Sequence, residues 1–127
     1  MELSQDSNPN PSTLYDLQLI YKMCRGDEEK VAKMIEVFIS QISQSIQEIM
    51  TAYSEKDFLR IERLVHKIKP TLTYFGTTSL EKEAHSLEDL LLKKSELSEL
   101  ELKILSFNAL TTEVVDKMKN DFNIINQ

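Results

Sequence analysis

The residue with the clearest chemical potential is His66, one of two histidines in the chain. A neutral imidazole is a competent nucleophile near pH 7, because its unperturbed pKa lies just below that value. Lys69 follows one helical turn later, close enough to neutralise an anionic group on the imidazole. The pair predicts nucleophilic chemistry at His66 that is directed at a negatively charged group.

His66 lies on the polar side of the helix predicted to carry it. Apolar residues in this segment recur at steps of three and four, and at about 100° per residue His66 lies roughly 130° from their mean direction. A surface histidine on a helix is usually an ordinary solvated residue, so position alone assigns no function. The helix is nevertheless locally basic, which suits an anionic partner. Its basic residues are Arg60, Arg63, Lys67 and Lys69.

The composition indicates one helical domain. The chain has 127 residues, of which 41% are hydrophobic, enough for a single packed core. It contains only two glycines and three prolines, and helix-forming residues are abundant, which favours an all-α fold. Residues 1–11 are polar and hold two of the prolines, so we expect a disordered leader before a domain spanning residues 12–127.

Capping residues and apolar periodicity predict one short helix followed by four longer ones. The short helix is predicted from about Leu14 to Cys24, with Ser12 or Thr13 as its N-cap and Gly26 as its stop. The last helix is predicted to start between residues 95 and 100. Short connections between long amphipathic helices predict antiparallel neighbours, hence an up-and-down antiparallel four-helix bundle with a short additional N-terminal helix.

Two capping boxes are predicted around the helix that carries His66. Ser54 and Asp57 resemble such a box at its start, and Thr78 and Glu81 fit the pattern at the start of the next helix. Gly76 is predicted to end the His66 helix. The predicted core seam of that helix is Phe58, Ile61, Val65, Ile68, Leu72 and Phe75.

Charge and hydropathy argue against several classes of partner. The formal net charge of −6 disfavours nucleic-acid binding, because phosphate contacts need a basic face. No apolar run approaches the length of a membrane span, and the N-terminus lacks the regions of a signal peptide. The single Cys24 cannot form an internal disulfide, which fits a reducing compartment. We therefore expect a cytoplasmic protein that binds neither nucleic acid nor membrane.

The residues around His66 resemble the histidine-containing phosphotransfer (HPt) domain family. The family pattern has a lysine three residues after the histidine and a glycine ten residues after it, and Lys69 and Gly76 stand at those positions. The similarity spans about residues 14–92, and beyond it only helical character agrees. Further matches are Leu80, Leu87 and Glu88, with Gly26, Asp27, Glu28, Glu29, Met34, Ile35 and Phe38 upstream.

The resemblance implies a phosphorelay carrier. His66 would attack the aspartyl phosphate of a response-regulator receiver domain, hold the phosphoryl group as phosphohistidine and pass it to a second receiver. Lys69 would stabilise charge on the transferring oxygens. The partner, a response regulator or a hybrid histidine kinase, would supply Mg²⁺ and most catalytic groups, so this chain is expected to bind no cofactor. It lacks the Gly-rich ATP-binding segments of a kinase and is expected to have no kinase activity of its own.

The face around His66 is expected to dock the receiver. Glu88 would lie beside the histidine on the next helix, where it either accepts a hydrogen bond from the imidazole or is an ordinary solvated residue. The residues predicted to dock the partner are Glu62, Arg63, Lys67, Pro70, Thr73 and Glu88.

Pro70 departs from the family pattern, which usually has glycine four residues after the histidine. Proline removes the amide that would bond the carbonyl of His66, and its ring crowds that carbonyl. We therefore expect a kink of more than about 20° between the two residues, with the hydroxyl of Thr71 or Thr73 relieving the carbonyl.

Other functions are less well supported by the sequence. The chain could be a pseudo-HPt adaptor that binds receivers without accepting phosphate, or a bundle that dimerises through its last helix, although we expect a monomer. His66, His85 and a nearby Glu62 or Glu88 could in principle bind zinc, but the lone cysteine and the absence of an HxxxH or HExxH spacing argue against a metal site. His85 is expected to be an ordinary surface residue.

Overall fold

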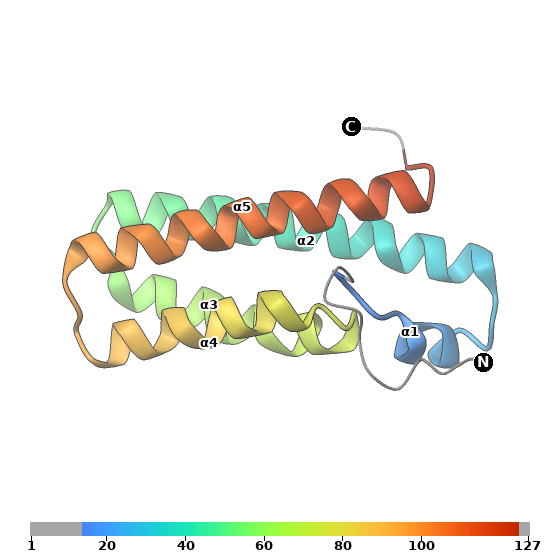
Figure 1. Cartoon of the computed structure of the whole chain (residues 1–127), viewed down its shortest axis with the longest axis horizontal. Helices are drawn as coiled ribbons and strands as arrows, with labels where there is room; N and C mark the ends of the chain where they lie inside the picture. The colour runs from blue at the N-terminus through green and yellow to red at the C-terminus, as the bar shows by residue number, and fades with distance from the viewer. Residues whose placement is uncertain (1–13, 125–127) are drawn as a thin grey trace.

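The computed structural model describes residues 14–124, which form five helices (Figure 1). Among these residues there is no strand. The four long helices run antiparallel to their sequence neighbours, α5 packs back against α2, and α1 lies at one end of the bundle against α2. The predicted four-helix bundle with an additional short helix is therefore confirmed. The helices are α1 (Gln18–Met23), α2 (Glu28–Ser54), α3 (Phe58–Tyr74), α4 (Thr78–Leu92) and α5 (Leu97–Asp121).

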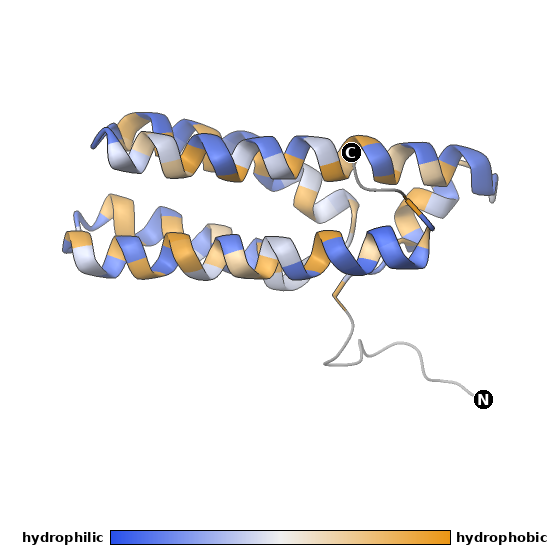
Figure 2. Ribbon diagram, turned by 90° about the horizontal axis from the view of Figure 1, so that it is seen from above, coloured by the Kyte–Doolittle hydropathy of each residue, from blue (hydrophilic) through white to orange (hydrophobic). Residues whose placement is uncertain are grey.

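The core is built from one apolar stripe on each helix. Figure 2 shows hydrophobic and hydrophilic residues sharing every long helix, as amphipathic helices require. Phe38 of α2 stacks on Phe75 at the end of α3, with ring centroids 4.5 Å apart. Burying each large apolar side chain contributes about 1.5–3 kcal/mol. The α3 stripe is buried from Ile61 onward, but Phe58 is 37% exposed because it lies in the first turn, so its assignment to the core is wrong.

The first helix begins later than predicted. Residues 14–17 are not helical, and α1 starts at Gln18 rather than near Leu14. The reason is tertiary, because the amide of Asp16 donates to the carbonyl of Gly76 in the α3–α4 connection at 3.1 Å. The Asp16 carboxylate in turn accepts from the amide of Gln18 at 3.0 Å. The predicted leader and the two proposed N-caps, residues 12 and 13, lie outside the described residues.

Both predicted capping boxes are wrong. Ser54 is the last residue of α2, and its hydroxyl donates to the carbonyl of Thr51 at 2.7 Å. Asp57 is itself the N-cap of α3 and accepts from the amide of Arg60 at 3.2 Å. The N-cap of α4 is Thr77, whose buried hydroxyl donates backwards to the carbonyl of Leu72 at 2.9 Å. A buried hydroxyl needs a partner, and this one takes a carbonyl from the end of α3.

Gly76 ends α3, as predicted. Its φ of 63° places it in the left-handed region, and its amide donates to the carbonyl of Thr73 at 3.0 Å. The amide of Thr77 donates to the carbonyl of Leu72 at 3.0 Å, which completes a Schellman motif. A Cβ at position 76 would lie 2.0 Å from the carbonyl oxygen of Asp16. Glycine is therefore required here both for the turn and for the close approach of the N-terminal segment.

None of the helices in the described part of the chain combines the length and the apolar character that a membrane span requires.

Candidate functional site

His66 lies in the middle of α3 and points away from the core. Its side chain is 81% exposed, whereas its neighbour Val65 is fully buried. The outward direction predicted from the apolar seam is therefore confirmed. An exposed imidazole is accessible to a group carried by another protein.

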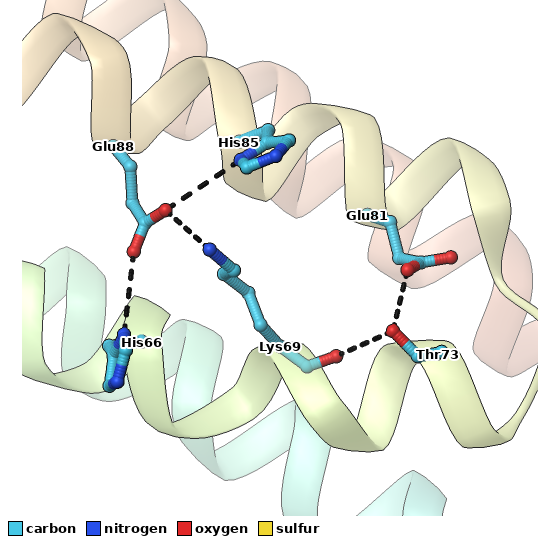
Figure 3. A network of polar contacts seen from close by, with 6 residues as sticks. All are labelled: His66, Lys69, Thr73, Glu81, His85 and Glu88. Atoms are coloured by element: carbon cyan, nitrogen blue, oxygen red, sulfur yellow. Dashed lines mark hydrogen bonds and ion pairs between the residues drawn. The ribbon is translucent and has the colours of Figure 1, made fainter.

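Glu88 of α4 connects His66 to Lys69 across the gap between α3 and α4 (Figure 3). Its Oε1 lies 2.7 Å from Nζ of Lys69, and its Oε2 lies 3.8 Å from Nδ1 of His66. The first contact is a charge-assisted hydrogen bond, while the second is longer than a hydrogen bond. The Glu88 side chain is only 17% exposed and that of Lys69 31%, so solvent screens this ion pair less than it would screen a pair on an open surface.

His85 reaches the same carboxylate from α4. Its Nδ1 lies 3.7 Å from Oε1 of Glu88, and its side chain is 75% exposed. The expected surface position of His85 is confirmed, whereas the sequence placed it near Glu88 only as a possible zinc ligand. The spacing of three residues between His85 and Glu88 was the available signal, because residues three apart on a helix are neighbours.

A second polar contact lies further along the same helix pair. The hydroxyl of Thr73 lies 2.6 Å from Oε2 of Glu81 and 3.3 Å from the carbonyl of Lys69. Its single proton is therefore directed mainly at the carboxylate. Glu81 was not among the predicted site residues. We call this edge the α3–α4 polar seam, defined as His66, Lys69, Thr73, Glu81, His85 and Glu88 (Figure 3).

The opposite side of α3 borders an apolar hollow of about 310 Å³. Thr71 and Tyr74 of α3 line it together with residues of α1 and α2, and we call it the α2–α3 hollow. Three of its apolar residues are largely exposed: Met23, Val37 and Tyr74, at 54%, 56% and 50%. Its residues come from three separate helices, so no local sequence pattern predicts this surface.

The predicted docking residues are not equally accessible. Arg63, Lys67, Pro70 and Thr73 are exposed on α3, and Glu62 is half-buried. Glu88 lies mostly within the polar seam instead of on an open surface. Contact of these six residues with a partner stays a prediction.

The helix α3 continues through Pro70 as one element. The size of the bend there stays a prediction. The expected relief of the His66 carbonyl by Thr73 is wrong, because that hydroxyl contacts Glu81 and the carbonyl of Lys69.

Within residues 14–124, no three or more His, Cys, Asp or Glu side chains are grouped so that they could hold a metal ion.

Comparison with known proteins places this arrangement in a family. A sequence model described as the Hpt domain matches residues 33–120, a stretch that contains the whole polar seam. The chain belongs to the Hpt domain family. Hpt domains are phosphotransfer modules, not kinases, and they act with receiver domains and histidine kinases in phosphorelay signalling.

A solved structure shows the same fold. The crystal structure of the Hpt domain from a sensor hybrid histidine kinase of Shewanella matches with a TM-score of 0.69 at 17% sequence identity. The match covers 88% of this chain and 96% of the Shewanella domain. No curated protein matches this Hpt domain in sequence.

Proposed function

We propose that His66 of this Hpt domain accepts a phosphoryl group from a receiver-domain aspartate and passes it to a second receiver. The observation that carries the proposal is the 81% exposed imidazole of His66 beside the Lys69–Glu88 ion pair. Exposure gives a large partner access to the ring, and the ion pair supplies both signs of charge next to it. The seam therefore combines a nucleophile with groups able to position it.

The ring orientation of His66 suggests which nitrogen reacts. Nδ1 faces the carboxylate of Glu88, so a proton on Nδ1 leaves the lone pair on Nε2. That lone pair attacks phosphorus as the bond between phosphorus and the aspartyl oxygen breaks, and the aspartate leaves as a carboxylate. The imidazole gains positive charge as the new bond forms, and the negative carboxylate of Glu88 stabilises that charge. The reverse order of events returns the group to a second receiver.

Lys69 is the cation available to the phosphoryl group. In the free protein its ammonium group is held by Glu88, which keeps it directed along the seam. A phosphoryl group on His66 would bring further negative charge near this ammonium group, and Lys69 would then stabilise the transferring oxygens. Preorganised charge of this kind is a large catalytic term, and loose phosphoryl transition states depend mainly on it and on positioning.

The partner completes the site under this proposal. The receiver supplies Mg²⁺ and the phosphorylated aspartate, whereas this chain supplies the nucleophile and a docking face and has no kinase activity of its own. The six predicted docking residues surround the histidine on or beside α3. We further propose that the domain acts as a monomer in the cytoplasm.

The test is phosphoryl transfer from a phosphorylated receiver with Mg²⁺ to the wild-type chain and to His66→Gln. His85→Gln is a matched control, since His85 is similarly exposed and contacts the same carboxylate. We expect acid-labile, base-stable label on wild type and His85→Gln, and none on His66→Gln. Absence of label from all three chains across a panel of receivers, with binding retained, would instead identify a receiver-binding adaptor.

A further inference from the structure

Pro70 alters the backbone at the reactive residue itself. In an α-helix each carbonyl accepts from the amide four residues later, and proline has no amide hydrogen. Pro70 lies inside α3, and the carbonyl that it deprives of a donor is the carbonyl of His66. Apart from the carbonyls of its last turn, α3 therefore has one carbonyl that lacks the usual amide donor. It is the carbonyl of the exposed His66.

No side chain of residues 14–124 replaces the missing donor. The Thr73 hydroxyl contacts Glu81 and the carbonyl of Lys69, and Thr71 lines the α2–α3 hollow on the other side of the helix. Both His66 and Pro70 are exposed. Because the proline ring occupies the space of the amide hydrogen, we expect the carbonyl to tilt outward past the ring, toward solvent.

A carbonyl oxygen that faces solvent can bind only a group that donates a hydrogen bond. Phosphoryl oxygens are acceptors, so the carbonyl cannot bind the group that is transferred. It requires an N–H or O–H donor, which must come from the protein that delivers or receives the group. Such a donor replaces water at the carbonyl when the partner docks.

We propose that the His66 carbonyl, exposed by Pro70, is a docking acceptor for a hydrogen-bond donor on the receiver domain, which makes Pro70 a determinant of receiver choice. This inference rests on the proposed function, because it concerns the partner that exchanges phosphoryl groups with His66. A receiver that presents a donor here binds better than one that presents an acceptor or an apolar side chain.

The experiment compares the wild-type full chain with Pro70→Ala and Pro70→Val. Both substitutions restore the amide at position 70, and valine also keeps bulk at the position of the ring. Each chain is first phosphorylated with phosphoramidate, a small donor that makes no docking contact. In a separate experiment, the dissociation constant of each unphosphorylated chain is measured for one receiver. That receiver is the one that exchanges phosphoryl groups fastest with wild type in a panel.

We expect both variants to bind the receiver about two- to tenfold more weakly than wild type, as for the loss of one hydrogen bond, while phosphoramidate labelling shows that His66 is reactive in each chain. Receiver binding equal to or tighter than that of wild type in both variants would overturn the proposal. Weaker binding by Pro70→Ala alone would also overturn it, since the proline ring and not the carbonyl would then make the contact. Failure of the wild-type chain to label with phosphoramidate or to exchange with any receiver would refute the proposed function, and this inference with it.

Discussion

On its α4 side, α3 meets its neighbour through charged and hydroxyl groups, whereas on its α2 side it borders an apolar hollow. The α3–α4 polar seam contains a 2.7 Å ion pair and a 2.6 Å hydrogen bond between helices. The α2–α3 hollow is lined mostly by hydrophobic side chains and encloses about 310 Å³. His66 belongs to the polar seam and does not line the hollow.

The polar seam and the apolar hollow are suited to different roles. Ion pairs and hydrogen bonds are directional, so the polar seam can orient an imidazole and hold a cation beside it. Apolar burial is not directional and scales with area, so the hollow is suited to adhesion. We therefore expect substitutions of Lys69 and Glu88 in the polar seam to slow phosphoryl transfer, and substitutions in the hollow to weaken receiver binding without changing the chemistry at His66.

After the loss of His66 itself, the largest effect is expected from Lys69→Ala. Removing a preorganised cation from the transferring oxygens should slow transfer from a receiver by about 100-fold. The measurement is a single-turnover transfer rate at saturating receiver concentration. Lys67→Ala is the control, because Lys67 is an exposed lysine on the same helix. Equal rates for the two variants would show that the polar seam does not carry the chemistry.

The next effect concerns the stability of α3 itself, which carries both surfaces. Pro70→Ala restores a helical hydrogen bond and removes a steric clash, so the free energy of unfolding should rise by about 1–3 kcal/mol. Urea denaturation followed by circular dichroism measures the change. A decrease would mean that the surrounding packing requires proline at position 70.

Glu88→Gln is expected to have a moderate effect on the polar seam. The amide keeps the size of the side chain but removes the negative charge that faces His66 and Lys69. Phosphoryl transfer should therefore slow about three- to tenfold. Rates are compared with those of Glu81→Gln, which alters the other carboxylate of the seam. A larger loss in Glu81→Gln would move the functional centre of the seam toward Thr73.

The smallest effect is expected in the α2–α3 hollow. Val37→Ser should weaken receiver binding about threefold, because it removes part of an exposed apolar surface, and should leave phosphoramidate labelling unchanged. Leu102→Ser is the control, since Leu102 is 68% exposed on α5, a helix that does not line the hollow. Slower phosphoramidate labelling in Val37→Ser would contradict the separation of the two surfaces.

Local chemistry explains which features were predictable from the sequence. The amphipathic period gave the helices and the outward direction of His66, and Gly76 ended α3 because its left-handed φ strongly favours glycine. The capping boxes were wrong because competing partners were nearby: Ser54 bonds within α2, and Thr77 bonds back to α3. The start of α1 was misplaced because Asp16 bonds to Gly76, sixty residues later.

The features of the site likewise fall into those set by the local sequence and those set by the packing of the helices. By itself the sequence determined the exposed histidine, the lysine one turn later and the proline that removes the amide, because each depends on spacing along one helix. Only the tertiary structure decided that Glu88 contacts Lys69 and both histidines, and that three helices enclose an apolar hollow. Those contacts depend on the rotation and register of α3 against α4 and α2, which packing of the whole core sets.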